Sequence, residues 1–339
     1  RQWHWKLNMP TPKIAFIGVS HWHFPLYVRN DLPEGYEIVA ISDENAKTVE
    51  RVSSNLNCKG YISYTELLDL EKPEFVFLFG QHASMCRIAK DVIERDIPFS
   101  IEKPSGLNTA EVLSIASFAK KKNVFSSVAL VYRLSHEWNA IQKLGGDTSC
   151  CIANMSFRQF GGPPDRYRAN GNGWMLDPAI AGGGCLINLG VHFIDMALAL
   201  GGGADVILGS HVSNCLQDED IEDYACVQLL LNSGGSAMIE VGYTMPINDI
   251  EQREMTISYA NRNGFVHTVE DGLLLHRYNC DSEAIVVSLE TDDYFQRYRD
   301  DTLHRFKSGL PPLASLYDMA NTMRIVDAVY SKIEPDTNA

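Results

Sequence analysis

The stretch of sequence most suggestive of chemistry is the run from Gly182 to Asp195, GGGCLINLGVHFID, which is apolar almost throughout after its glycines. On a helix at about 100° per residue, Asn188, His192 and Asp195 lie within roughly 60° of one another. Both flanks of this polar stripe are apolar, which is typical of a buried helix. Buried polar groups cost a few kcal/mol each unless they are hydrogen-bonded. The stripe therefore predicts either internal partners or a ligand.

Two interpretations of His192 follow from this helix alone. A neutral imidazole titrates near physiological pH, so a catalytic His192 would accept a proton from a hydroxyl group. The alternative is a core histidine whose hydrogen bonds are satisfied by neighbours such as Asn188.

A second suggestive segment is Glu102-Lys103-Pro104, which ends a short apolar run, PFSI, at 98–101. If that run is a strand of a parallel sheet, both charged side chains point into the cleft where such sheets bind ligands. A lysine ammonium there would stabilise an alkoxide that forms during alcohol oxidation.

Strands and helices alternate in the part of the chain that carries this segment. The predicted strands are 13–18, 36–42, 74–80, 98–102 and 124–132, and the predicted helices are 46–55, 64–70, 83–95 and 109–122. Such alternation predicts an α/β domain over residues 10–132, with a doubly wound parallel sheet covered by helices on both faces.

Beyond residue 132 the pattern changes to successive strands, with a helix at 186–200 inserted among them. The predicted strands are 150–158, 206–213, 224–231, 236–243, 255–259, 273–278 and 284–289. A hairpin turn at Asn232-Ser233-Gly234-Gly235 makes its neighbouring strands antiparallel. We therefore expect an α+β domain over 133–312 with a mostly antiparallel sheet. Two late helices are predicted at 293–307 and 316–332.

The turn after the first predicted strand reads Gly18-Val19-Ser20-His21-Trp22-His23. A dinucleotide-binding fingerprint places glycine at positions 18, 20 and 23, for a tight turn and close approach to the pyrophosphate. Only Gly18 follows this pattern, so an ordinary strand-to-helix turn remains an alternative.

Asp43 follows the second predicted strand, where a carboxylate would accept hydrogen bonds from an adenosine ribose. Glu44 comes next and no arginine lies beside it, so a 2′-phosphate would be repelled and NAD is favoured over NADP. A helix cap or turn residue is the alternative role for Asp43.

His21, His23 and His82 are the residues that first suggest a metal. With no carboxylate or thiol pair nearby in the sequence, they fall short of a ligand set, and no metal is expected. We expect these histidines to line the phosphate loop or its rim.

Composition sets limits on the function. The chain has 339 residues, 45% of them hydrophobic, and a net charge of −14, which argues against a nucleic-acid or anionic-membrane partner. Its eight cysteines form no CxxC pair, and no signal peptide or apolar run of membrane-spanning length is evident, so a cytoplasmic location is expected. The polar and aromatic opening RQWHWKLN is excluded from the fold prediction.

With these motifs in order, the chain from about 13 to 333 resembles the Gfo/Idh/MocA oxidoreductases, the relatives of glucose-fructose oxidoreductase and inositol dehydrogenase. The resemblance rests on Glu102-Lys103-Pro104, on WMLDP at 174–178 and on the glycines at 182–184, followed by Asn188, Gly190, His192 and Asp195. The segment 74–89 also looks like the family's fourth strand and following helix.

The resemblance implies a Rossmann domain that carries NAD(P) and a substrate domain whose large open sheet often mediates oligomerisation. It implies that a last helix, within 313–335, packs back on the first domain. Lys103 matches the family lysine that orients the substrate hydroxyl, and His192 matches the usual acid/base. We therefore expect a dehydrogenase that transfers hydride between nicotinamide and a secondary alcohol of a sugar, cyclitol or related polyol.

The predicted site residues fall into three groups. The catalytic group is Lys103, His192 and Asn188. The cofactor-binding group is Gly18, Ser20, His21, Trp22, His23, Asp43, Gly80, Gln81, His82, Glu102 and Lys103. The substrate group is Arg133, Arg158 and Trp174, although these arginines could equally be surface residues. Arg166 and Tyr167 lie on the same segment as the expected specificity residues, 157–168.

Two departures from the family pattern keep other functions open. The first loop is poor in glycine, and the family often has aspartate where this chain has Asn188. A nicotinamide-binding regulatory protein without turnover is one alternative, and a glycosidase or lyase that keeps its NAD bound is the other.

Overall fold

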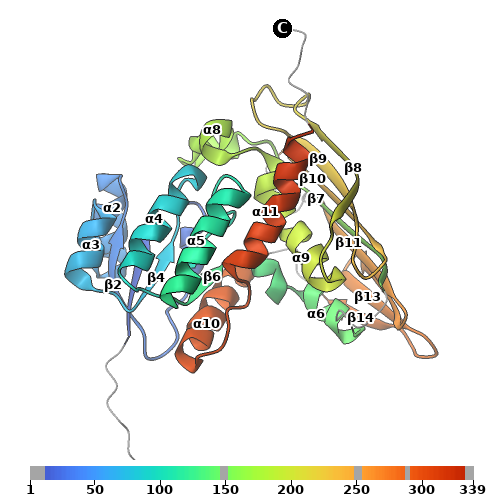
Figure 1. The fold of residues 1–339 in the computed structure, drawn as a ribbon, viewed down its shortest axis with the longest axis horizontal. Helices are drawn as coiled ribbons and strands as arrows, with labels where there is room; N and C mark the ends of the chain where they lie inside the picture. The colour runs from blue at the N-terminus through green and yellow to red at the C-terminus, as the bar shows by residue number, and fades with distance from the viewer. Residues whose placement is uncertain (1–11, 146–151, 248–253, 287–290, 333–339) are drawn as a thin grey trace, which may run out of the picture.

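The structure is a computed structural model that describes residues 12–145, 152–247, 254–286 and 291–332. It contains a six-stranded sheet built from residues 13–128 and an eight-stranded sheet built from residues 152–286. Figure 1 shows the two sheets at opposite sides of the molecule, with helices α9 and α11 between them. The first sheet is parallel and the second mostly antiparallel, as the sequence predicted.

The first sheet has the strand order of a doubly wound nucleotide-binding domain, β3-β2-β1-β4-β5-β6. Its strands are β1 (Lys13–Ile17), β2 (Glu37–Ser42), β3 (Lys59–Tyr61), β4 (Phe75–Leu78), β5 (Phe99–Ile101) and β6 (Ser126–Val128). Helices α2 (Ala46–Leu56), α3 (Tyr64–Glu71), α4 (His82–Glu94) and α5 (Thr109–Lys122) cover it. The short runs β1, β4 and β5 are buried because helices cover both faces, so their sequences are apolar without alternation.

Two sequence predictions differ from this sheet. Strand β3 was missed because only three residues pair, and none of them is buried. The predicted strand 124–132 is shorter than expected, since pairing ends at Val128 and a 3₁₀ turn, η1 (Val131–Leu134), leads into helix α6 (His136–Lys143).

The second sheet has the order β14-β13-β12-β11-β7-β10-β9-β8, and among its described strands only β7 and β10 pair in parallel. Its strands are β7 (Ile152–Phe160), β8 (Val206–Ser213), β9 (Tyr224–Leu230), β10 (Ser236–Gly242), β11 (Glu254–Asn261), β12 (Gly264–Val269), β13 (Gly272–Arg277) and β14 (Glu283–Val286). Strand β12 was not predicted, because its run GFVHTV is short and carries polar residues. The predicted strand ends at 150–151 and 287–289 lie outside the described residues.

The polar stripe lies on a helix that differs from the one predicted. A π-helical turn, η3 (Leu186–Gly190), precedes the regular helix α9 (Val191–Gly201). Glu222 holds the start of this segment, because its carboxylate accepts the backbone N–H groups of Gly184 at 2.7 Å and Leu186 at 2.9 Å. Helix α9 packs against β7 and β10 on one side and against α11 (Leu316–Tyr330) on the other.

The segment Pro178–Gly201 is long and apolar enough to cross a membrane by length and composition, so the expectation of no such run was wrong. Most of this segment is buried inside the protein, which accounts for its apolar character.

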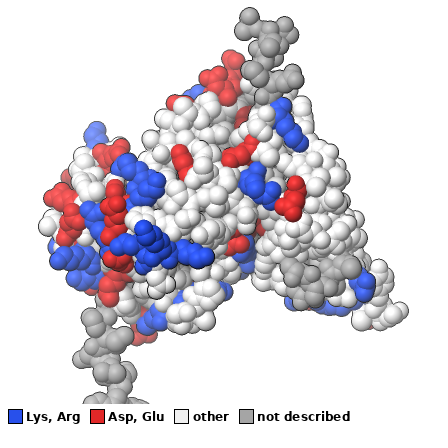
Figure 2. All heavy atoms as spheres, viewed as in Figure 1, with Lys and Arg blue, Asp and Glu red and all other residues white. Residues whose placement is uncertain are grey.

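The two late helices connect the halves of the chain. Helix α10 (Asp293–Ser308) contacts η1 and the one-turn helix α1 (Phe24–Tyr27), and α11 packs against α5. Arg299 of α10 is fully buried and donates hydrogen bonds to the carbonyl oxygens of Tyr27, Asn30 and Asp31. On the face seen in Figure 2, charged side chains of both signs gather over the helices of the first sheet.

Candidate active site

Two cavities lie where the first sheet meets the second half of the chain. The Lys103 cavity has a volume of about 340 Å³, and Lys103, Asn188 and His192 are among its lining residues. The Asp43 cavity has a volume of about 190 Å³, and its lining includes Gly18 and Asp43. Both open beyond the carboxyl ends of parallel strands, the place where sheets of this kind bind ligands.

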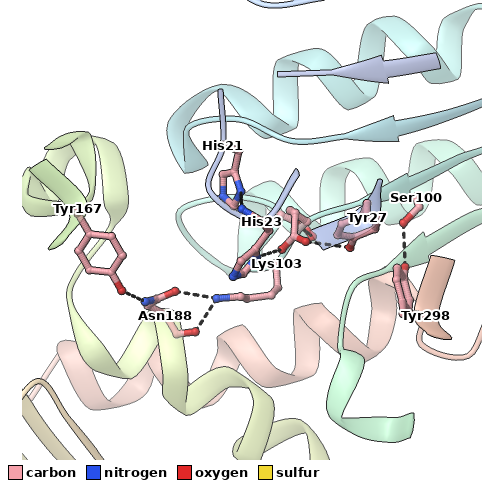
Figure 3. Close-up of polar contacts among 10 residues, drawn as sticks. His21, His23, Tyr27, Ser100, Lys103, Tyr167, Asn188 and Tyr298 are labelled. Atoms are coloured by element: carbon pink, nitrogen blue, oxygen red, sulfur yellow. Dashed lines mark hydrogen bonds and ion pairs between the residues drawn. The ribbon is translucent and has the colours of Figure 1, made fainter. Parts of the chain in front are cut away.

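Lys103 follows β5 and is 3% exposed. Its ammonium donates hydrogen bonds to the backbone oxygen of Asn188 at 2.6 Å and to the side-chain Oδ1 of Asn188 at 2.7 Å (Figure 3). Burial lowers the pKa of Lys103 to about 8, although the nearby Glu102 acts in the opposite direction. This lysine is therefore fixed in place by neutral acceptors.

Asn188 also uses its amide nitrogen. Nδ2 donates to the hydroxyl of Tyr167 at 2.6 Å and to that of Tyr243 at 2.9 Å. The side chain thus connects Lys103 with two tyrosines from the second half of the chain, of which Figure 3 shows Tyr167. Sequence reasoning placed Asn188 in the site but paired it with His192 and missed Tyr243, which lies just past the end of β10.

His192 lines the same cavity as Lys103 and is 5% exposed. Its ring packs on Tyr132 with a centroid distance of 4.8 Å, and its Nδ1 is buried without a hydrogen-bond partner among the described residues. Burial, and then the charges of Lys103 and His23, hold the pKa of His192 well below its usual range. The imidazole is therefore in its neutral base form, and the lowered pKa makes it a weaker proton acceptor than a free histidine.

Asp195, the third residue of the stripe, does not face the cavity. Its two carboxylate oxygens accept hydrogen bonds from Arg133 Nη2 at 2.6 Å and Nε at 2.8 Å. Arg133 also donates to the backbone oxygen of Leu313 at 2.8 Å and lies 3.2 Å from a carboxylate oxygen of Asp318. The structure therefore places Arg133 outside the Lys103 cavity predicted for it, with its guanidinium held by Asp195, Leu313 and Asp318.

Arg158 lies on the opposite face of the second sheet from the cavity. Successive strand residues point to opposite faces, so Arg158 points away while its neighbour Gln159 lines the Lys103 cavity. It pairs with Glu240 at 2.9 Å and Glu254 at 2.8 Å. The structure therefore does not bring Arg158 together with Lys103 and His192, as its predicted substrate role requires.

Trp174 lines the Asp43 cavity instead of the Lys103 cavity. It belongs to η2 (Gly173–Leu176), its Nε1 donates to Asn172 Oδ1 at 3.1 Å, and it meets the His82 ring edge-on at 5.0 Å. It therefore lines a different cavity from Lys103 and His192.

The first loop turns sharply at Gly18, which has a φ of 81°. A Cβ atom there would lie 2.3 Å from the backbone oxygen of Phe79, so no other residue fits. Asp43 accepts the backbone N–H of Ser20 at 2.7 Å and that of Asn45 at 2.9 Å. Asp43 thus holds the loop while it also lines the cavity, together with Ser20, Gly80 and Gln81.

The three histidines around the loop lie in different places. His23 lines the Lys103 cavity, His21 lines the Asp43 cavity, and His82 is 1% exposed, with Nδ1 2.7 Å from the backbone oxygen of Ala181. Burial lowers the pKa of His82 to about 3 and the pKa values of His21 and His23 well below the usual range.

A carboxylate that lies far from His21 and His23 in the sequence, Glu102, is close to these histidines in the structure. Its Oε2 lies 3.2 Å from His23 Nδ1, and its Oε1 accepts a hydrogen bond from Tyr27 at 2.9 Å (Figure 3). The residues that the structure describes contain no group of three or more His, Cys, Asp and Glu side chains that could hold a metal ion.

The residues around both cavities fit a dinucleotide. The cavities adjoin at the first loop, where Trp22 of the Lys103 cavity stacks on His21 of the Asp43 cavity at 4.2 Å. His21 Nε2 and His82 Nε2 are buried and have no hydrogen-bond partner among the described residues, so polar ligand groups could satisfy them. Asp43 lines the second of these cavities, and a carboxylate there could accept a hydrogen bond from a ribose hydroxyl.

Comparison with known proteins agrees with this geometry. Residues 13–130 match the model of an oxidoreductase family with an NAD-binding Rossmann fold, and residues 151–260 match the GFO/IDH/MocA C-terminal domain. Fold and site thus define an NAD-binding oxidoreductase. Since the two matches together span more than half of its length, the chain belongs to the Gfo/Idh/MocA family. No curated protein matches it.

Solved structures share the fold at low sequence identity. A levoglucosan dehydrogenase in complex with NADH and levoglucosan is 14% identical, with 94% of this chain and 96% of that chain covered and a TM-score of 0.81. An oxidoreductase from Agrobacterium radiobacter with NAD+, L-tartaric acid and magnesium is 16% identical (95% and 96% covered, TM-score 0.80). An aldose-aldose oxidoreductase from Caulobacter crescentus with glycerol is also 16% identical (95% and 97% covered, TM-score 0.76).

Proposed function

We propose that this protein is a dehydrogenase that transfers hydride between NAD and a secondary alcohol of a sugar, cyclitol or related polyol. The observation that carries the proposal is the presence of Lys103 and the neutral His192 in one buried cavity. The neighbouring structures with levoglucosan and with glycerol support a substrate of this class.

In the proposed reaction, His192 accepts the proton of the substrate hydroxyl, because its imidazole is neutral and lines the cavity. Lys103 donates a hydrogen bond to the same oxygen and stabilises the negative charge that develops on it. Asn188 holds the ammonium in position through two acceptors. NAD, when bound, supplies the hydride acceptor.

We further propose that NAD binds more tightly than NADP. Asp43 and Glu44 both line the Asp43 cavity, so a 2′-phosphate would meet two carboxylates there. The loop and its rim, at Gly18, Ser20 and Gly80, would hold the dinucleotide together with these residues.

The test is a screen of sugars and cyclitols with NAD⁺, followed by absorbance of the reduced nicotinamide. On the substrate found, His192→Ala and Lys103→Ala should each lower turnover at least about 100-fold, the usual scale for a positioned acid or base. His211→Ala, on the exposed strand β8, is the matched control and should leave turnover unchanged.

Normal turnover by His192→Ala would contradict the proposal and make the polar stripe structural. NAD that is tightly held by the purified protein, without net reduction by any polyol, would favour the glycosidase or lyase instead. NAD binding without turnover of any substrate would favour a regulatory protein.

A homo-oligomer formed through the second sheet is also proposed. Its face away from α9 carries exposed apolar side chains, among them Leu208, Met238 and Phe265. Light scattering should then show an oligomer for the wild-type protein and a smaller species for Met238→Lys. A monomeric wild-type protein would contradict this. The cytoplasmic location remains a prediction.

A further inference from the structure

Arg166 is a cation in the Lys103 cavity to which the proposed reaction gives no role. It begins the short helix α7 (Arg166–Ala169), which follows the loop after β7. Its guanidinium lies 4.7 Å from the ring centre of Tyr167 and 4.8 Å from that of Tyr243. Contact with two aromatic rings fixes the orientation of the planar group.

The hydrogen bonds of Arg166 go to neutral acceptors only. Nη1 contacts the backbone oxygens of Gly162 and, at 3.0 Å, Pro163, and Nη2 donates to the Tyr167 hydroxyl at 3.0 Å. Among the described residues no carboxylate pairs with it. A guanidinium carries more N–H donors than these contacts use, so Arg166 can still bind an anion through Nε and Nη2.

Arg168, two residues further along the same helix, shows the more common arrangement, in which an arginine pairs with carboxylates. Its guanidinium pairs with Glu219 and, at 3.0 Å, with Asp165, and it does not line the cavity. The two arginines therefore differ in a way that the local sequence does not explain.

A hydrogen-bonded chain connects Arg166 with Lys103. The Tyr167 hydroxyl accepts from both Arg166 and Asn188, and Asn188 Oδ1 accepts from Lys103. Arg166 and Lys103 thus belong to one wall of the cavity, separated by a tyrosine hydroxyl and a carboxamide (Figure 3 shows the part from Tyr167 to Lys103).

The charged side chains that line the cavity are mainly cationic, although the whole chain has a net charge of −14. Among its described lining residues Asp292 is the only acidic one, and its carboxylate lies 3.8 Å from Arg29 Nη1. An anion in the cavity would therefore meet two cations, Lys103 and Arg166, and a carboxylate that already has a cationic partner.

We infer that the substrate is a sugar acid whose carboxylate binds Arg166 while its reacting hydroxyl lies at Lys103 and His192. The position of the hydroxyl rests on the proposed function, whereas the anion site rests on Arg166 and its surroundings alone. A volume of about 340 Å³ is enough for a monosaccharide acid. A phosphate of the cofactor offers the same oxyanion chemistry, so the experiment must separate the two sources.

The experiment measures binding by calorimetry, without turnover, in the absence and presence of NADH. The ligands are D-glucuronate, D-galacturonate and D-gluconate, each compared with its neutral counterpart D-glucose, D-galactose or D-glucitol. Wild type should bind at least one acid more tightly than the matching neutral compound. Arg166→Met should weaken that acid about 10- to 100-fold, the range for a lost hydrogen bond to a charged group, and leave the neutral compound unchanged.

Four controls make the result specific. Arg168→Met removes a cation from the same helix and should bind the acid like wild type. Arg166→Lys keeps the positive charge without the planar guanidinium and should retain part of the affinity for the acid. NADH, titrated alone by fluorescence, should bind wild type and Arg166→Met equally, and circular dichroism establishes that the variant is folded.

The inference is overturned if no acid binds more tightly than its neutral counterpart, or if Arg166→Met weakens both alike. It is also overturned if Arg166→Met weakens NADH but not the acid, since the cation would then serve a cofactor phosphate. Failure of the proposed dehydrogenase activity is a separate outcome, because acid binding by Arg166 is measured without turnover.

Discussion

The side-chain oxygen of Asn188 lies 2.7 Å from the Nζ atom of Lys103, and the backbone oxygen of the same residue lies 2.6 Å from it. Both acceptors are neutral, so they orient the ammonium without neutralising its charge. Burial then lowers the pKa of Lys103 to about 8, which brings its deprotonation into the working pH range.

The first prediction concerns the pH profile of kcat/KM. Lys103 must be protonated to stabilise an alkoxide, so the profile should fall as pH rises through about 8. His192 must be neutral, and because its pKa is lowered by burial, the acid limb should lie below pH 6.5. Lys103→Arg, whose guanidinium does not titrate, should remove the basic limb. A basic limb that persists unchanged in this variant would assign it to another group.

The second prediction concerns Asn188→Asp. A carboxylate in contact with Lys103 favours the ammonium, so the basic limb should move to higher pH by about 1 to 3 units. The spacing of residues 188 and 192 predicts instead a shift of the acid limb, but the structure directs the side chain to Lys103. Asn170→Asp adds a carboxylate to the same cavity without that contact and should move the limb less. Equal shifts of the basic limb in both variants would mean that the contact between residue 188 and Lys103 does not determine this shift.

The third prediction concerns Asp43→Ala. This change removes the acceptor for the N–H groups of Ser20 and Asn45, and it removes a carboxylate from the cavity. NADH affinity should fall at least about 10-fold, and the preference for NADH over NADPH should narrow. Fluorescence titration of both cofactors measures this. Glu44→Gln keeps the loop contacts, so it should narrow the preference for NADH over NADPH without weakening NADH binding itself. An unchanged ratio of NADH to NADPH affinity in both variants would contradict the proposed preference for NAD.

The fourth prediction separates the two arginines that the sequence assigned to substrate. Asp195→Ala leaves Arg133 without its main partner in a buried environment and should lower the free energy of unfolding by about 3 to 5 kcal/mol. The double variant Arg133→Met, Asp195→Leu should recover most of this loss. Arg158→Met removes two partly exposed ion pairs and should change stability by less than about 1 kcal/mol. Urea unfolding measures all of these, and a small effect of Asp195→Ala would mean that the pair is not structural.

The sequence by itself determined most of the elements of both sheets and the two residues around which the candidate site is proposed. Apolar runs alternating with amphipathic helices predict the parallel sheet, because burial on both faces removes polar residues from its strands. Lys103 and His192 were found because each carries a polar group within or beside an apolar run, a local signal that needs no knowledge of distant contacts.

Only the tertiary structure decided which partners these side chains have. Asn188 contacts Lys103, which is 85 residues away in the chain, and Asp195 contacts Arg133, which is 62 residues away. Such pairs depend on how the two halves of the chain pack together. The π-helical turn η3 adds to this, because a wider turn changes which residues of the helix share a face. Helical periodicity therefore located the polar stripe, but long-range packing separated its residues into Asn188 and His192 in the cavity and Asp195 in a buried ion pair.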